Sequence, residues 1–313
     1  MTGRRYELVH TTTYAYPEPV TTSYGRAVLL PRDLPDQRCT AATVTVDPAP
    51  ADQARHTDYF GNTSTYFAVT TPHTRLSVTA RSALTVTRQQ ASVPGLPGLA
   101  WEGVARMVHD GATSTDGVSS LDTREAVLPS RHVLPSDTVR AWAAPSFAPG
   151  RPVAALLADL AHRMRTEMTY RSGSTTVSTT QAELLETRTG VCQDFAHLMI
   201  AALRAHGLPA RYVSGYVETL PPPGRPKIRG ADASHAWVSA WVPGAGWVEI
   251  DPTNDKFVDD RYVVLGWGRD YGDVPPLRGV IFTEGSGARP EVSVDLHPVD
   301  DGEAPTPGTT TRP

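Results

Sequence analysis

The chain has 313 residues, of which 40% are hydrophobic and 20% are charged. This composition is typical of globular proteins, and the length suggests two domains. The net charge of −4 argues against a nucleic-acid partner or an anionic-membrane surface, because either would need a basic face.

The chain contains two cysteines, Cys39 and Cys192. They are too few for a disulfide scaffold, and without a CxxC pair we expect no zinc site within one chain. No apolar run is long enough for a transmembrane helix, and the first residues lack the apolar core of a signal peptide. These patterns predict a cytoplasmic protein.

Aromatic, Val and Thr residues alternate with polar ones in the first part of the chain, which is typical of half-buried strands. The alternating runs are 6–16, 41–48, 64–70 and 75–87. They predict an antiparallel β domain over residues 1–90. Residues 91–135 are rich in Gly, Pro, Ser and Thr and predict a linker with short helices.

Helical spacing of apolar residues begins after this linker. It predicts one helix over 152–168, a second from about Thr180, and a third over 191–205 that Gly207 and Pro209 terminate. Strand-like runs follow the third helix, at 211–218, 235–242, 246–250 and 262–265.

The order of helices followed by strands predicts an α+β core over residues 136–285, rather than a doubly wound sheet. Residues 286–313 complete the chain. They predict a terminal strand at 291–296, which could return to the β domain, and a flexible tail.

Cys192 lies two residues after Gly190, which allows a tight turn into the third predicted helix. In the first turn of a helix, the dipole and the free N–H groups stabilise a thiolate. The same N–H groups could polarise a substrate carbonyl as an oxyanion hole. A lone cysteine is more often a small buried hydrophobe, so this role depends on a base nearby.

His235 and Asp251 supply that base and its partner. His235 begins one predicted strand, Asp251 ends the next, and the short loop 243–246 joins the two strands. Adjacent antiparallel strands would place the carboxylate beside the imidazole, where it would fix the tautomer and stabilise the imidazolium. Cys192, His235 and Asp251 therefore form the predicted catalytic set.

Seven segments of the chain share a pattern of residues with one protein family. They are 10–14, 58–62, 190–198, 207–216, 235–238, 246–253 and 268–279. These segments resemble the transglutaminase-like family of cysteine enzymes, in its bacterial form with an N-terminal β domain. The resemblance implies a papain-like transglutaminase core with Cys192 as nucleophile, His235 as base and Asp251 as orienting residue.

Gln193, Asp194 and Trp237 are weaker supporting candidates. Gln193 could add an amide donor near the oxyanion, and Asp194 could either serve the chemistry or complement the helix dipole. Trp237 is two residues beyond His235, so it would share the same sheet face and could shield a thiolate–imidazolium pair from water.

Other polar residues are expected to be structural. His197 lies about 140° around the helix from Cys192, so we expect a buried histidine with satisfied hydrogen bonds. Cys39 has no histidine nearby in the sequence. Asp255, Asp259 and Asp260 are expected to be solvated rather than to bind a metal, and the mechanism needs no metal or organic cofactor.

The predicted function is acyl transfer through a thioester on amide bonds of peptides or proteins. Water as acceptor would make the chain a peptidase or amidase, which we favour, and an amine would make it a transamidase. Two alternatives stay open: a non-catalytic protein- or peptide-binding module on this scaffold, and acetyl transfer from coenzyme A. The expected partner is a peptide or protein substrate, with no nucleic acid and no membrane.

Overall fold

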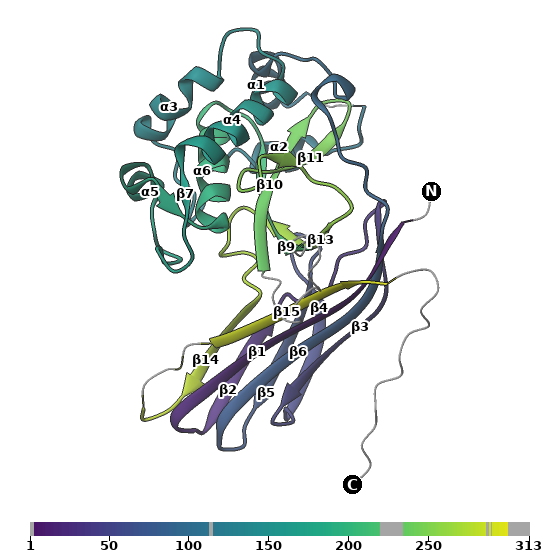
Figure 1. Cartoon of the computed structure of the whole chain (residues 1–313), viewed down its shortest axis with the longest axis vertical. Coiled ribbons are helices and arrows are strands. Elements are labelled where there is room, and N and C mark those ends of the chain that lie inside the picture. The colour runs from purple at the N-terminus through teal and green to yellow at the C-terminus, as the bar shows by residue number, and fades with distance from the viewer. Residues whose placement is uncertain (1–2, 113–114, 220–233, 286–287, 289, 300–313) are drawn as a thin grey trace, which may run out of the picture.

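The computed structural model describes residues 3–112, 115–219, 234–285, 288 and 290–299. Strands form one half of the molecule, and the helices with a further sheet form the other half (Figure 1). None of the helices within the described residues is both long and apolar enough to cross a bilayer.

The strand-rich half is a sandwich of two four-stranded antiparallel sheets, with orders β15-β1-β6-β3 and β14-β2-β5-β4. Their bounds are β1 Arg4–Val20, β2 Thr22–Ala27, β3 Gln37–Asp47, β4 Asp52–Thr57, β5 Thr63–Val69, β6 His73–Val86, β14 Leu277–Phe282 and β15 Pro290–Pro298. Side chains from both sheets, among them Val46, Phe67 and Val78, share one core. Alternating burial along β1 and β6 matches the alternation in the sequence.

Both ends of the chain contribute to this sandwich. β15 pairs with β1, so the strand predicted at 291–296 does return to the β domain. β14 pairs with β2, although it lies inside the range 136–285 predicted for the core. The strands β2, β4 and β14 were not predicted from the sequence.

The helices of the second half include two in the predicted linker. Their bounds are α1 Trp101–Asp110, α2 Ser120–Glu125, α3 Asp137–Ala143, α4 Val153–Glu167, α5 Gln181–Thr187 and α6 Cys192–Ala205, with short 3₁₀ turns η1 Val93–Gly95 and η2 Ala144–Ser146. Val104 and Val108 of α1 are buried in the same core as α4 and α6. Helix α1, inside the predicted linker, is therefore packed against the core.

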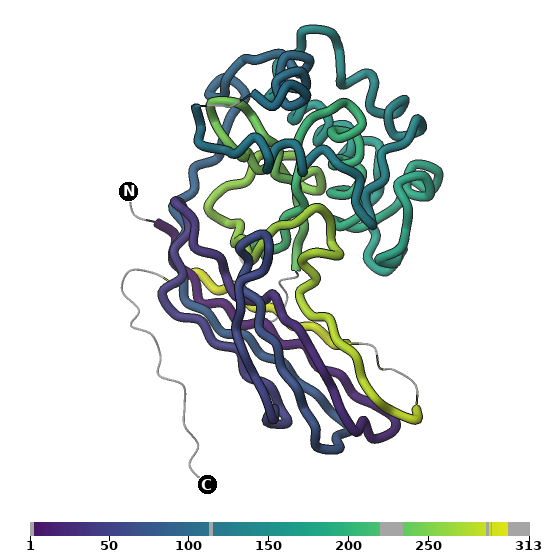
Figure 2. Tube along the Cα trace, turned by 180° about the vertical axis from the view of Figure 1, so that it is seen from behind, coloured from purple at the N-terminus to yellow at the C-terminus, as the bar shows by residue number. Residues whose placement is uncertain are grey.

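A five-stranded antiparallel sheet lies between the helices and the sandwich (Figures 1 and 2). Its order is β12-β11-β10-β9-β13, with bounds β9 Ala210–Val217, β10 Ser234–Val242, β11 Gly246–Asp251, β12 Lys256–Phe257 and β13 Tyr262–Gly268. Helix α6 packs on one face of this sheet. Tyr216, Val263 and Leu265 of this sheet pack against Tyr6 and Leu8 of β1.

Candidate active site

Cys192 is the first residue of α6 and is half-buried. The chain reaches it through β8 Thr189–Gly190, which pairs in parallel with β7 Thr169–Tyr170. Gly190 ends β8, only Val191 separates it from the helix, and its φ is not positive. Gly190 is needed for close approach: a Cβ there would lie 2.7 Å from Leu184 Cδ1 and 3.0 Å from Asp194 Oδ2.

Asp194 is buried and bonded at the start of α6. Its Oδ2 accepts hydrogen bonds from the Val191 N–H, at 2.8 Å, and from Thr175 Oγ1, at 2.6 Å. Burial raises the pKa of this carboxyl, and the two hydrogen bonds oppose the rise. These contacts support the helix-start role over a chemical one, because the carboxylate satisfies a free N–H of the first turn.

His235 and Asp251 meet on adjacent strands. β10 and β11 pair in antiparallel register, with Val238 opposite Ile250. This register brings His235 Nε2 to 2.7 Å from Asp251 Oδ2. The bond occupies Nε2 and leaves Nδ1 for the thiol of Cys192, which also acts as a hydrogen-bond partner of the ring.

The electrostatics favour an imidazolium. Burial by itself lowers the pKa of His235, but the charge and hydrogen bond of Asp251 and the hydrogen bond to Cys192 raise it to about 10. Burial would raise the pKa of Asp251, yet His235 and the other donors hold it below its usual range. The pair therefore consists of a cation and an anion at neutral pH.

Asp251 is fully buried and accepts five hydrogen bonds. Oδ1 accepts from the backbone N–H groups of Thr253, at 2.8 Å, and Asn254, at 3.3 Å. Oδ2 accepts from His235, from Asn254 Nδ2 at 2.6 Å, and from the Tyr262 hydroxyl at 2.8 Å. These donors fix the carboxylate toward the imidazole.

Asn254 and Tyr262 were not predicted from the sequence. The order Asp-Pro-Thr-Asn after a strand signals a turn in which the Thr253 N–H, two residues on, donates to Asp251, and Asn254 follows in that turn. Tyr262 carries no such signal, since β13 and β11 are separated in the sheet by β10 and β9.

Trp237 lies beside His235, as its position on β10 predicts. The two ring centroids are 6.1 Å apart, and the buried indole donates from Nε1 to Glu249 Oε2 at 2.9 Å. The indole also meets the Tyr262 ring edge-on, at 5.3 Å. At Gly215 on the neighbouring strand, a Cβ would lie 2.4 Å from the Trp237 ring, so a glycine is required there.

The remaining predicted residues lie apart from this pair or contribute no bond to it. Gln193 is half-buried and makes no side-chain hydrogen bond to any residue that the structure describes. His197 is buried, accepts from the Tyr271 N–H at 3.2 Å, and has a pKa lowered to about 3 by burial. The Cys39 thiol contacts the Ala41 carbonyl oxygen at 3.4 Å on β3.

The loop aspartates bind basic side chains. Asp255 lies 2.8 Å from His162 Nδ1, and Asp259 pairs with Lys256 and Arg261 at 2.5 and 3.0 Å. Within the described ranges, no group of three or more His, Cys, Asp or Glu side chains is arranged to hold a metal ion.

Two tyrosines complete the surroundings of the thiol. Burial is the main cause of the raised pKa of Tyr170 and of Tyr212, and Cys192 is the next cause for both. Tyr170 is half exposed, whereas Tyr212 is buried beneath α6. Tyr170 pairs with Gly190, two residues before Cys192, and its aromatic ring is half exposed there.

Two sequence profiles match this chain. The bacterial transglutaminase-like N-terminal region matches residues 6–85, and the transglutaminase-like superfamily matches residues 140–252. An uncharacterized protein of Mycobacterium tuberculosis is 49% identical over 300 residues, which cover 95% of this chain and 93% of that protein. The chain belongs to the transglutaminase-like superfamily.

Two further similarities agree with this transglutaminase-like assignment. A protein-glutamine gamma-glutamyltransferase of Pseudomonas aeruginosa is 44% identical over 71 residues, or 22% of this chain and 11% of that protein. The crystal structure of a candidate cysteine protease from Cytophaga hutchinsonii superposes with a TM-score of 0.74 at 21% identity, covering 96% of this chain and 93% of that one. The predicted fold, a papain-like α+β core preceded by an antiparallel β domain, is confirmed.

Proposed function

We propose that this transglutaminase-like chain is a cysteine-dependent acyl-transfer enzyme that acts on amide bonds of peptides or proteins through a thioester. The observation that carries the proposal is the buried His235–Asp251 pair, which faces Cys192 at the N-terminus of α6. An imidazolium and a helix N-terminus both favour a thiolate over a thiol.

The reaction follows from these positions. The Cys192 thiolate attacks the amide carbon and forms an S–C bond, while the backbone N–H of Cys192 faces the developing oxyanion. His235 gives its proton to the departing amine as the C–N bond breaks. The neutral imidazole then removes a proton from the acceptor, which attacks the thioester and releases Cys192.

Asp251 and Trp237 have positioning roles in this scheme. Asp251 fixes the ring and offsets its charge, and the five hydrogen bonds it accepts keep it ionised. Trp237 covers one side of the imidazole and limits the access of water to the ion pair. We favour water as acceptor, and an amine acceptor is the second form of the same chemistry.

Alkylation by iodoacetamide tests the thiolate. We expect Cys192 to react faster than Cys39 at pH 6 to 7 and to lose this advantage in His235→Ala. Cys39 is the internal control, because burial raises the pKa of its thiol. Equal rates at the two cysteines in the native protein would contradict the proposal and favour a binding module, which needs no ionised thiol.

The acceptor is tested with a glutamine-containing peptide, with and without a labelled primary amine. Release of ammonia or of a cleaved peptide without incorporation of the label identifies a hydrolase. Incorporation of the label identifies a transamidase. Cys192→Ser is the matched control and should abolish both products.

A further inference from the structure

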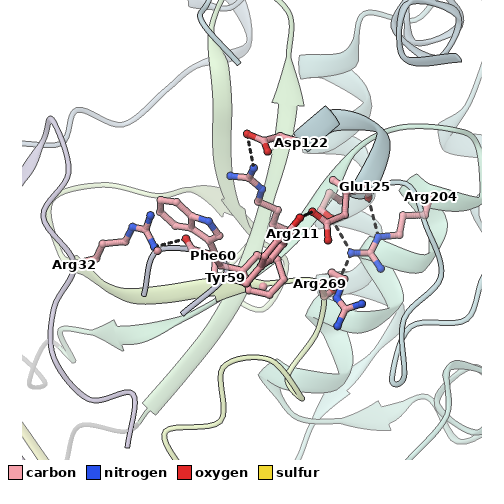
Figure 3. Close-up of a pocket in the computed structure, with 13 residues that line it drawn as sticks. Arg32, Tyr59, Phe60, Asp122, Glu125, Arg204, Arg211 and Arg269 are labelled. Carbon is pink, nitrogen blue, oxygen red and sulfur yellow. Dashed lines mark hydrogen bonds and ion pairs between the residues drawn. The ribbon is translucent and has the colours of Figure 1, made fainter. Parts of the chain in front are cut away.

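A cavity lies where the β sandwich meets the helical half, and its lining is rich in arginine (Figure 3). Its volume is about 420 Å³. The loop around Phe60 forms one side, α2 forms another, and Arg211 of β9 and Trp267 of β13 form the floor. Pockets between structural units are frequent sites for small ligands.

Arg211 is a largely buried cation with few partners. Its side chain is 17% exposed, and its ion-pair partner is Asp122, at 3.7 Å. The guanidinium makes no hydrogen bond to a side chain or carbonyl of the residues that the structure describes. It stacks on Trp247, with its carbon 3.6 Å from the ring centre, and lies 5.6 Å from that of Trp267.

Arg32 lies over the Trp267 ring, with its guanidinium carbon 3.7 Å from the ring centre. Its Nη1 donates to the Phe60 carbonyl oxygen at 2.7 Å and to Asn62 Oδ1 at 2.8 Å, both uncharged acceptors. Among the described residues, Nε and Nη2 of Arg32 have no acceptor. Gly61, with φ of 76°, lets the loop approach Nη2, because a Cβ there would lie 2.7 Å away.

The other charged residues of the lining that face the cavity already have partners. Arg204 donates to three carbonyl oxygens and to Ser130 Oγ. Arg269 forms a two-point ion pair with Asp273. Glu125 accepts from the Tyr59 hydroxyl at 3.1 Å. The unused hydrogen-bonding capacity of this cavity therefore belongs to the two guanidinium groups near Trp267.

Arg211 and Arg32 both line the cavity, and none of their nitrogen atoms is fully buried without a partner, so their free N–H groups are accessible. Burial lowers the pKa of Arg211, the charges of Asp122 and Glu125 oppose this, and the charge of Arg32 adds to it, so the pKa is about 10. Planar guanidinium groups bind carboxylate and phosphate oxygens with strong paired hydrogen bonds.

We propose that this cavity, which Arg211 and Arg32 both line, binds a small oxyanion, a carboxylate or phosphate group. The site is separate from the cysteine. Arg204 lines the cavity near the end of α6, and Cys192 begins that helix, so they lie about 18 Å apart along its axis. Tyr212, adjacent to Arg211, lies under α6 and belongs to its core, so Arg211 projects from the opposite sheet face.

The test titrates the full-length protein with inorganic phosphate and, separately, with succinate at constant ionic strength, by calorimetry. We expect saturable binding of at least one of the two anions. Arg211→Met should weaken it by about tenfold or more, because hydrogen bonds to the charged group are lost. Arg38→Met, at a side chain that is 75% exposed on the sandwich, removes the same charge and should leave binding unchanged.

Comparison of the two anions shows which kind of ligand the site binds. Binding of phosphate alone assigns the site to a tetrahedral phosphate group, and binding of succinate alone assigns it to a carboxylate. Absence of saturable binding for both would overturn the proposal. Equal losses in Arg211→Met and Arg38→Met would also overturn it, because the attraction would then be a general effect of charge.

Stability without ligand is the second readout. Met fills similar space between the indoles, and the substitution removes a buried charge, so Arg211→Met should unfold at the same or a higher temperature than the native protein. A lower midpoint together with unchanged anion binding would make Arg211 a structural residue. Cys192→Ala should bind the anion as the native protein does, which keeps this test independent of the proposed acyl transfer.

Discussion

Asp251 shows how one buried carboxylate organises the active site. A hydrogen bond to an ionised group contributes about 1.5 to 3 kcal/mol, and five donors surround this carboxylate. Two of these donors are backbone groups of the turn after β11, so the turn itself orients the side chain. The imidazole receives a partner whose position and charge are fixed before substrate binds.

Tyr262→Phe tests this organisation at the level of one hydroxyl. Loss of the donor should raise the pKa of Asp251 and weaken its hold on His235, so the thiolate becomes less favourable. We expect the alkylation rate of Cys192 at pH 7 to fall by up to roughly tenfold. Tyr24→Phe, on the sandwich, is the matched control and should react at the native rate. A native rate in Tyr262→Phe would show that the hydroxyl is dispensable.

His235 gives a pH-dependent contribution to stability. Its folded pKa of about 10 lies above the unfolded value of about 6.5, so the folded state binds the proton more tightly. The contribution is complete below pH 6.5 and is lost as the pH rises toward 10. The stability difference between the native protein and His235→Gln should therefore shrink from pH 6 to pH 10, as measured by urea unfolding.

The control for this series of unfolding measurements is His162→Gln, which alters an exposed histidine ion pair. Its stability difference from the native protein should be small at each pH, because exposed pairs contribute little. A difference for His235→Gln that stays constant across the range would show that the imidazole is not held as a cation.

At this scale the sequence predicted the residues whose partners are near in the chain. A short loop between β10 and β11 is enough to bring His235 and Asp251 together. Tyr262 was not predictable, because its place beside Asp251 depends on the curvature of a whole sheet. The same holds for Arg211, whose surroundings come from three distant segments.

The start of α6 is the element that the site depends on most. The N-cap is Val191, which offers no side-chain oxygen, so Asp194 supplies the capping bond from within the helix. The preceding strand is held by the Arg171 N–H, which donates to the Gly190 carbonyl at 3.0 Å. The position of Cys192 is therefore fixed by contacts on both sides of it.

Gly190→Ala tests whether this close packing positions the nucleophile. The added methyl group would press on buried Leu184 and on Asp194, and overpacking of this kind costs about 1 to 3 kcal/mol. We expect a lower unfolding midpoint and slower alkylation of Cys192. Gly98→Ala is the control, because a Cβ at Gly98 meets nothing within 4 Å. An unchanged midpoint in Gly190→Ala would disprove the constraint.

Among elements, periodicity predicted those with a strong apolar face. α4 and α6 lie close to their predicted ranges. The apolar surface of α6 extends all around it, since every residue from Asp194 to Ala205 is buried. β4 is exposed along its whole length, so its sequence carries no alternation of burial. β14 is an edge strand with mostly exposed side chains, and its pairing with β2 joins residues that are far apart in the chain.

At the scale of the whole molecule, the β sandwich packs against β9 and β13 of the five-stranded sheet. Tyr6 and Leu8 of β1 share a core with Tyr216 and Val263, and the Tyr6 hydroxyl donates to Glu218 at 2.8 Å. Alternation in each strand predicted that a face would be buried, but not which partner would bury it. The sandwich is therefore part of the support for β9 and β10, the latter of which carries His235.

A buried histidine links the two halves. His10 of β1 lies with Nδ1 2.7 Å from the Tyr216 hydroxyl of β9, and with Nε2 2.8 Å from Thr12 Oγ1. In a neutral ring one nitrogen donates and the other accepts, and the two hydroxyls can take the complementary roles, so the neutral ring satisfies both contacts. Burial lowers the pKa of His10 to about 4, which means that folding disfavours its protonation.

This link predicts a loss of stability in mild acid. Between pH 6.5 and 4 the unfolded chain binds a proton at His10 that the folded chain excludes, so the free energy of unfolding falls by up to about 3 kcal/mol as the pH decreases. Urea midpoints at pH 7 and pH 5 should differ less in His10→Asn than in the native protein, whereas His56→Asn, on exposed β4, should keep the native difference. An equal acid sensitivity in His10→Asn would mean that the junction between the sandwich and the core does not sense this proton.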